Sequence, residues 1–182
     1  MLNQIITYWK LHKIPIVLAV LSIGFYYTFA YHLDRADFIK LITLFGALFF
    51  LCFKLIQFEK WNFKFLLFIG ILFRLVFLFT EPNLSQDYYR FIWDGRMILE
   101  GISPYLYTPE SFISKNVFPI VQAKELYEGM GALNASHFSN YPPINQLCFV
   151  IAGLFAGKSI LGATLVLRFI IMVAFVGILF LW

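Results

Sequence analysis

The chain has 182 residues, of which 61% are hydrophobic, 20% aromatic and 13% charged, and its formal net charge is +4 at pH 7. A soluble domain carries roughly 25% charged residues, and a chain of this length cannot bury so much apolar surface in one soluble core. These values exclude a water-soluble globule. The basic residues form no stripe or recognition motif, so no nucleic-acid partner is expected.

Long apolar runs predict helices that cross a membrane. The five predicted spans are residues 14–31, 38–57, 64–80, 143–157 and 159–182. No segment shows the alternating pattern of a membrane β-barrel. The predicted fold class is therefore all-α: a polytopic membrane helical bundle, 1–182 as a single membrane domain, with a partly helical external loop at 81–142.

Charge predicts which side each connection faces. The short polar segments near the N-terminus, at 54–64 and at 158 carry six lysines against one acid, Glu59. The positive-inside rule puts them in the cytoplasm. Segments 32–37 and 81–142 hold the other nine of the ten acidic residues and are predicted to be external. We expect a multi-pass protein of the cell membrane with a cytoplasmic N-terminus.

The ends of the chain and its two cysteines suggest three smaller predictions. The first apolar run is predicted to be a retained signal anchor. Cys52 and Cys148 lie inside apolar runs, which favours buried, inert thiols over a disulfide framework or a zinc site. The last predicted span ends at Trp182 without a polar tail, so we expect a fragment of a longer protein.

The external loop is predicted to be ordered because it is rich in aromatic residues. Read as a helix, its stretch 86–101 places Asp87, Arg90 and Asp94 within about 60° of one face. This polar stripe can face a cavity while Tyr88, Ile92 and Leu99 lie on another face. The alternative is that Asp87 and Arg90 form a solvated pair that contributes only a few tenths of a kcal/mol.

Glycine and proline mark the limits of this helix and the return to the membrane. Gly101 and Pro104 predict its end, and the prolines and tyrosines of 103–112 predict an ordered extended segment. Pro142 and Pro143 interrupt any helix before the fourth span. Tyr141, which precedes them, is by itself best explained as a residue of the interfacial aromatic belt.

Two arginines lie inside predicted spans, where a charge is costly. Arg74 is about six residues, or roughly 9 Å, from the outer end of its run. It can extend outward to the headgroups or hold an anionic group such as a lipid phosphate. Arg168 lies deeper and is expected to need an internal partner.

Three segments together resemble one known family. They are "FRLVFLF" (73–79), "SQDYYRFIWDGRMILEGISPYLY" (85–107) and "NYPPINQL" (140–147). They resemble the first large external loop of GT-C fold glycosyltransferases, and more narrowly of bacterial polyprenyl-phosphate-mannose-dependent mannosyltransferases and related hexosyltransferases. The resemblance covers about residues 70–155.

The resemblance implies an enzyme that moves a hexose, mannose as first choice, from a polyprenyl-phosphate donor to the hydroxyl of a glycan or lipid acceptor. Asp87 matches the family's essential acid, the general base of an inverting displacement. The implied substrate-binding residues are Arg74, Tyr89, Arg90, Asp94, Arg96 and Tyr141. Arg90 is the first candidate for the donor phosphate, because guanidinium groups bind phosphate bidentately.

The resemblance implies no cofactor. Gln86 stands where many relatives carry a second acid, which argues against a divalent metal. Membrane lipid is an expected partner. The main alternative is a transporter or flippase component for lipid-linked sugars, since an intramembrane Arg and a cavity-facing acid suit transport too. A third possibility is an anchor or assembly subunit, which would leave the polar stripe without a task.

Overall fold

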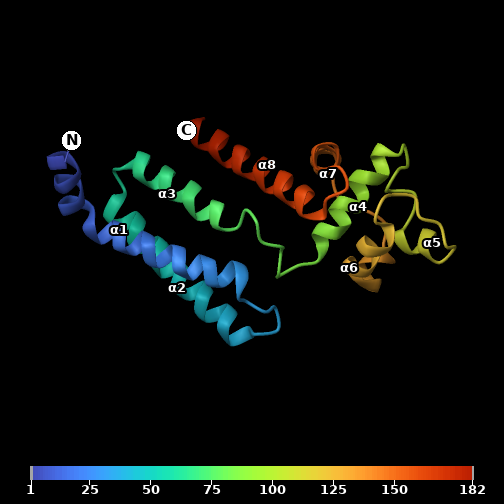
Figure 1. Ribbon diagram of the computed structural model, residues 1–182, viewed down its shortest axis with the longest axis horizontal. Coiled ribbons are helices and arrows are strands. Elements are labelled where there is room, and N and C mark those ends of the chain that lie inside the picture. The colour runs from blue at the N-terminus through green and yellow to red at the C-terminus, as the bar shows by residue number, and fades with distance from the viewer. Residues whose placement is uncertain (1, 182) are drawn as a thin grey trace. The chain divides into compact units, whose positions relative to one another are not determined.

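Residues 2–181, which the computed structural model describes, form eight α-helices and no strand, so the predicted all-α class is confirmed (Figure 1). The helices are α1 (Leu2–Tyr31), α2 (Phe38–Glu59), α3 (Phe63–Val76), α4 (Asp87–Leu99), α5 (Pro109–Ile113), α6 (Ala123–Ala135), α7 (Pro143–Ala156) and α8 (Ile160–Phe180). They gather in two compact units, Met1–Asn83 and Leu84–Trp182. Their organisation as one membrane domain stays a prediction.

Helices α1, α2 and α3 form the first unit, in which α1 packs against both others. Helix α1 is kinked at His12, where φ is −112° and ψ is 15°. The kink lies three residues before Pro15, whose ring cannot fit against the carbonyl group four residues earlier in a regular helix. Beyond the kink, Ala19 packs in a small core with Leu55, Phe65 and Ile69.

A polar cluster joins the kink of α1 to the connection between α2 and α3. The Glu59 carboxylate is only 5% exposed. His12 Nδ1 lies 2.5 Å from its Oε1, and Asn62 Nδ2 donates to its Oε2 at 2.9 Å. The Asn62 side chain also accepts from the backbone N–H of Phe65 and so caps α3. The buried charge is therefore fully engaged.

Three helices are long and apolar enough to cross a membrane: Leu11–Tyr31, Phe38–Glu59 and Ile160–Leu179. Large apolar side chains such as Phe45 and Phe49 are exposed on them, as expected where lipid is the solvent. The chain is therefore a membrane protein. The predicted spans 64–80 and 143–157 are not confirmed as crossings. Their helices, α3 and α7, have 14 residues each, or about 21 Å against the roughly 30 Å of a hydrocarbon core.

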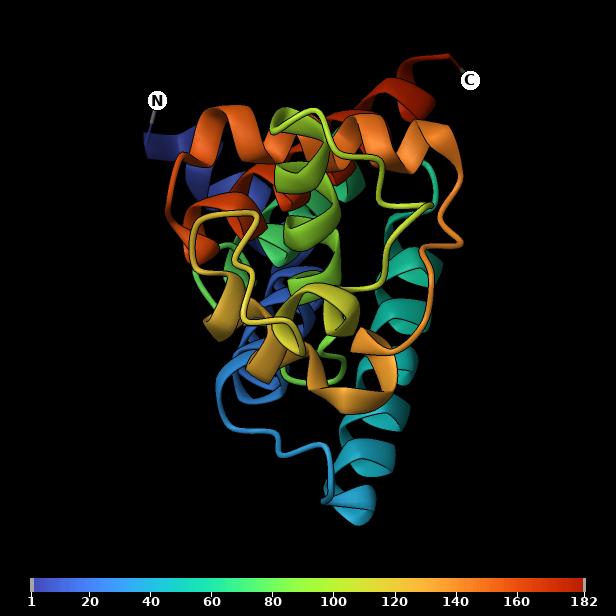
Figure 2. The same ribbon diagram turned by 90° about the vertical axis from the view of Figure 1, so that its right-hand side faces the viewer.

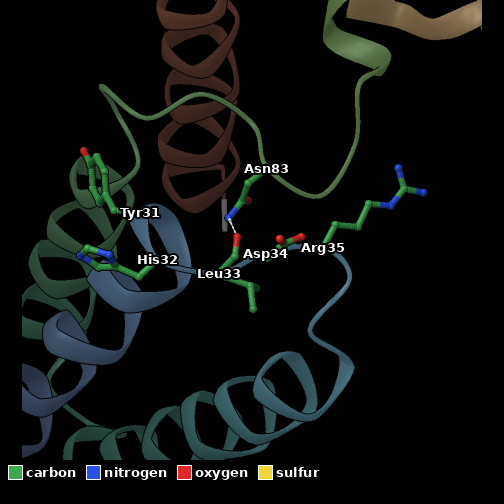
Figure 3. A pocket seen from close by; sticks show the side chains of 6 residues that line it. All are labelled: Tyr31, His32, Leu33, Asp34, Arg35 and Asn83. Carbon is green, nitrogen blue, oxygen red and sulfur yellow. Dashed lines mark hydrogen bonds between the residues drawn. The ribbon is translucent and has the colours of Figure 1, made fainter.

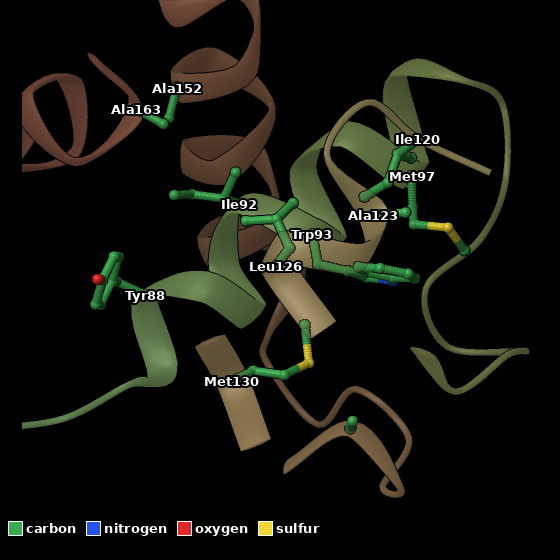
Figure 4. Close-up of a cluster of buried hydrophobic side chains, with 11 residues drawn as sticks. Tyr88, Ile92, Trp93, Met97, Ile120, Ala123, Leu126, Met130, Ala152 and Ala163 are labelled. Atoms are coloured by element: carbon green, nitrogen blue, oxygen red, sulfur yellow. The ribbon is translucent and has the colours of Figure 1, made fainter. Parts of the chain in front are cut away.

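Helix α4 is the centre of the second unit. It packs against α6, α7 and the start of α8, and Figure 2 shows it crossing α7. Its apolar side supplies the largest side chains of the core, which is drawn in Figure 4. The main residues of this core are Tyr88, Ile92, Trp93 and Met97 of α4, Leu126 and Met130 of α6, Ala152 of α7 and Ala163 of α8.

The end of α4 confirms the predicted stop signal. Gly101 has φ of +76°, a conformation that only glycine adopts without strain. The backbone N–H of Gly101 donates to Ile98 O, and that of Ile102 donates to Met97 O. This is the Schellman arrangement, which satisfies carbonyl groups at the end of a helix. Ile102 then packs against the core.

Two parts of the loop differ from the prediction. The segment 103–112 is not wholly extended, because Pro109–Ile113 forms α5. Thr108 begins this helix: its side chain accepts from the N–H of Ser111, and Pro109 fits the first helical position. Helix α6 was not predicted, because Gly129 and Gly131 interrupt its apolar pattern, and Gly131 has φ of +77°.

One prediction for the first unit is also wrong. Cys52 was expected to be buried, but it is exposed on α2.

Glycine allows α4 and α7 to approach closely. A Cβ atom at position 95 would lie 2.3 Å from the carbonyl oxygen of Phe149, a distance that real Cβ atoms do not reach. A Cβ atom at position 153 would lie 2.8 Å from Cδ1 of Leu99. The first contact is with backbone, so α4 and α7 can keep this crossing only if residue 95 is glycine.

We expect Gly95→Ala to destabilise the second unit by about 1–3 kcal/mol or more, because the added methyl group forces the two backbones apart. Thermal unfolding in detergent, followed by protease sensitivity of the loop, measures this. Gly46→Ala is the matched control, since a Cβ atom at Gly46 on α2 meets nothing within 4 Å. Equal stability of the two variants would contradict the close crossing.

Candidate functional site

Asp87 stands at the first position of α4, and its side chain is exposed. A carboxylate at a helix N-terminus is stabilised by the unpaired N–H groups and the helix dipole. The side-chain amide of Asn134, at the end of α6, donates to Asp87 Oδ1 at 3.1 Å. The acid is thus held at one oxygen, which leaves Oδ2 for a substrate group.

Arg90 and Asp94, one helical turn apart on α4, form a buried ion pair. Their exposed fractions are 1% and 0%, and Arg90 Nε lies 2.8 Å from Asp94 Oδ1. Asp94 Oδ2 accepts hydrogen bonds from Ser139 Oγ at 2.5 Å and from Gln146 Nε2 at 3.0 Å. Both oxygens of the Asp94 carboxylate therefore accept hydrogen bonds from the protein, and the donors come from three segments.

The guanidinium group of Arg90 also contacts the end of α6 and the loop that follows it. Arg90 Nη1 donates to the carbonyl oxygens of Asn134 at 3.0 Å and His137 at 2.9 Å. Arg90 thus fixes the backbone of the residue whose side chain holds Asp87. A polar chain of contacts runs from Gln146 on α7 through Asp94, Arg90 and Asn134 to the exposed Asp87.

This geometry corrects both sequence interpretations of the polar stripe. Asp87, Arg90 and Asp94 do lie on one helix, as predicted, but Arg90 and Asp94 do not face an open cavity. The solvated pair of Asp87 with Arg90 is also wrong, because the partner of Arg90 is Asp94. The stripe divides into a buried structural pair and one exposed acid.

Asp94→Ala should lower the free energy of unfolding by about 3–5 kcal/mol, because it leaves the Arg90 charge buried without its partner. Chemical denaturation of the purified protein, read by tryptophan fluorescence, measures the loss. Glu128→Ala, which removes an exposed acid from α6, serves as control and should change stability little. An Asp94→Ala variant whose free energy of unfolding is unchanged would show that the ion pair does not hold this unit together.

Three aromatic rings from α4, α7 and the segment before α7 form a cluster: Phe91, Tyr141 and Phe149. Phe91 stacks on Phe149 with ring centroids 4.6 Å apart, and Tyr141 meets both rings edge-on, at 5.0 Å and 5.6 Å. Tyr105 Oη donates to the carbonyl oxygen of Tyr141 at 2.6 Å. These contacts fix the half-buried Tyr141 beside the polar chain.

Burial raises the pKa of the Tyr141 hydroxyl, and the negative charges of Asp87 and Asp94 raise it further, while Arg90 opposes them. With an ordinary pKa of about 10 the phenol is already neutral at physiological pH, and the upward shift does not change that state. Tyr141 therefore offers a hydrogen-bond donor within electrostatic reach of the exposed acid. Among the residues predicted to bind substrate, Tyr141 thus interacts with Asp87 through charge, whereas Arg90 is linked to it through Asn134.

The Trp-Asp-Gly-Arg motif at 93–96 has structural contacts at every position. Trp93 lies in the core, and Gly95 makes the crossing with α7. Arg96 Nη1 donates to Val121 O at 2.7 Å and to Gln122 Oε1 at 3.1 Å. Burial lowers the pKa of Arg96, and Glu125 opposes the shift. The motif organises the loop rather than presenting groups to solvent.

The other predicted residues lie elsewhere. Tyr89 is half-buried, and its ring lies against Tyr88 and over Gly129 of α6. Arg74 belongs to the first unit, where it is exposed and donates to Gly70 O at 2.9 Å. Their roles in substrate binding stay predictions.

Sequence reasoning missed the partners that hold the acids: Asn134, Ser139 and Gln146. Ser139 adjoins and Gln146 lies within the stretch 140–147 that carried part of the resemblance, but no spacing rule pairs them with Asp94. The role of Asn134 had no sequence signal, because it depends on where α6 ends.

A separate hollow lies in the first unit, at the end of α1. It has a volume of about 460 Å³ (Figure 3). The residues that line it are Tyr31, His32, Leu33, Asp34, Arg35 and Asn83. Asn83 Nδ2 donates to the carbonyl oxygens of Phe29 and Leu33, which closes the end of α1. None of the predicted site residues lines this hollow.

Among residues 2–181, no group of three or more His, Cys, Asp or Glu side chains could hold a metal ion. No family model, curated protein or solved structure matches the chain.

Proposed function

We propose that the chain is part of a membrane glycosyltransferase of the GT-C type. It transfers a hexose, mannose as first choice, from a polyprenyl-phosphate donor to the hydroxyl of a glycan or lipid acceptor on the external side of the cell membrane. The observation that carries the proposal is the Asp87 carboxylate, exposed at the start of α4 and held at one oxygen by Asn134.

Asp87 acts as the general base in this proposal. Its second oxygen, Oδ2, takes the proton of the acceptor hydroxyl. At the same time, the oxygen of that hydroxyl group attacks the anomeric carbon of the sugar. The bond from the anomeric carbon to the phosphate oxygen breaks, and the lipid phosphate leaves with the electron pair, inverting the configuration. A carboxylate placed in this way contributes about 10²–10⁴-fold to the rate.

Tyr141 supports a sugar ring beside the base. Its neutral hydroxyl can donate to a sugar oxygen, and its ring offers an apolar face of the kind that suits amphipathic ligands. A pocket that fixes its ligand with a few polar groups on an aromatic lining is typical of small-molecule sites.

Arg90 takes a different role from the one that the family resemblance implies. Its guanidinium group is buried and engaged with Asp94 and two carbonyl oxygens, so in this proposal it positions Asn134 and not the donor phosphate. Arg96 is buried as well and donates to Val121, Gln122 and Gly157, so the proposal does not assign the phosphate to either arginine of α4.

Asp87→Asn is expected to reduce transfer by about 10²–10⁴-fold while leaving folding intact, because the amide keeps the shape of the carboxylate but cannot accept the proton. Transfer from a radiolabelled polyprenyl-phosphate mannose in membranes measures it. Glu128→Gln, an exposed acid of α6, is the control.

Near wild-type transfer by the Asp87→Asn variant would exclude Asp87 as the base. Because Asp94 is fully buried and both its oxygens accept hydrogen bonds from the protein, no other acid of α4 could then replace Asp87. The transport alternative would be favoured by a different pair of results. The unsubstituted protein would show no sugar transfer, and the Asp87→Asn variant would no longer move the lipid-linked sugar across the membrane.

Asn134→Ala should lower kcat about tenfold with little change in KM, because one hydrogen bond of about 1.4 kcal/mol no longer orients the carboxylate. The fold should survive, since Arg90 contacts the backbone of residue 134 and not its side chain. Steady-state transfer kinetics test this prediction. An unchanged kcat would show that Asp87 needs no such support.

A further inference from the structure

Helix α7 lies against α4 on its inner face. Gln146 donates to Asp94, residue 149 touches the backbone at Gly95, and residue 153 lies beside Leu99. These contacts follow one another along α7 from its first turn to its last. All of them lie within the second unit.

Both ends of α7 meet the same loop. At its start, Gln146 also donates to Ser139 Oγ at 2.9 Å. At its end, the guanidinium group of Arg96 donates to Val121 O at 2.7 Å and to Gly157 O at 3.5 Å. One side chain thus joins the residue after α7 to the loop between α5 and α6.

A helix that crossed the bilayer would not allow this contact. The positive-inside rule places Val121 outside and Lys158 inside, on opposite sides of a hydrocarbon layer of about 30 Å. A single guanidinium group cannot reach across such a layer.

The outer face of α7 is an apolar stripe. Ile144, Leu147, Leu154 and Phe155 are 65%, 53%, 63% and 79% exposed. Their spacing of three, seven and one residues puts them on one side of a helix, opposite the side that meets α4. The strongly apolar α8 begins only four residues after α7 ends, at Ile160, so this stripe lies close in the chain to a helix that is long and apolar enough to cross a membrane.

We infer that α7 does not cross the membrane. It lies on the membrane surface on the same side as the loop 84–142, with the stripe Ile144, Leu147, Leu154 and Phe155 inserted among the lipid chains. Helix α8 then crosses from the loop side, which puts the end of the chain on the side opposite the loop.

The charge pattern fits this arrangement. Amphipathic helices at the interface bury an apolar face while basic residues stay at the headgroups. Lys158, directly after α7, can reach a lipid phosphate at the surface. A single lysine is a weak topological signal beside the contact between Arg96 and Gly157.

Cysteine labelling in intact cells compares the two sides. In a Cys52→Ser, Cys148→Ser background, Ser114→Cys reports the loop and Lys158→Cys reports the end of α7; both native side chains are exposed. An impermeant maleimide should label both positions or, if the loop proves cytoplasmic, neither until the cells are opened. Labelling of only one of the two before opening would overturn the inference.

A fusion after Trp182 gives a second, independent measure. Green fluorescent protein fluoresces when the end of the chain is cytoplasmic, and alkaline phosphatase is active when it is external. We expect the fusion and the loop cysteine to report opposite sides of the membrane. The same side for both would mean that α7 and α8 each cross, contrary to the inference.

Spin labels test that lipid is what covers the stripe. A label at Phe155→Cys should collide more often with oxygen, which concentrates in lipid, than with a water-soluble nickel complex, and a label at Ser114→Cys should show the reverse. A label at position 155 that meets neither reagent would reveal a protein partner on this face. One that meets mainly nickel would show a face open to water. Either result would overturn the lipid assignment.

Discussion

The buried ion pair between Arg90 and Asp94 holds three segments of the second unit together. Desolvating two charges costs several kcal/mol per ion, and only good geometry with further hydrogen bonds offsets that cost. Here the further bonds come from Ser139 and Gln146 on one side and from the backbone after α6 on the other. The pair therefore requires that α4, α6 and α7 stay in place together.

The crossing at Gly95 imposes the same requirement by a different force. Backbone meets backbone where α4 passes α7, one residue beyond Asp94. The carboxylate can reach Gln146 only because no side chain at position 95 keeps the helices apart. The ion pair and the close helix crossing thus depend on each other. The crossing requires glycine at position 95, and the ion pair requires an acid at position 94.

The sequence predicted what local patterns determine. Helix α4 and its end at Gly101 follow from the apolar periodicity and from a glycine in the left-handed conformation. The partner of Arg90 did not follow, because Asp87 and Asp94 are both within reach on a helix and tertiary burial chose between them. Residues 143–157 were predicted to span the membrane from their apolar average, and such an average does not show that the helix has 14 residues and one exposed apolar side.

Arg90 contacts Asn134 and His137 through their carbonyl oxygens, which every amino acid supplies. Ser139 and Gln146 contact Asp94 through side chains, which few amino acids could replace. This network therefore places no requirement on which side chains stand at positions 134 and 137. It does require hydrogen-bonding side chains at positions 139 and 146. If descendants of this sequence keep an amide at position 134, selection acts there through the Asp87 carboxylate and not through the stability of the fold.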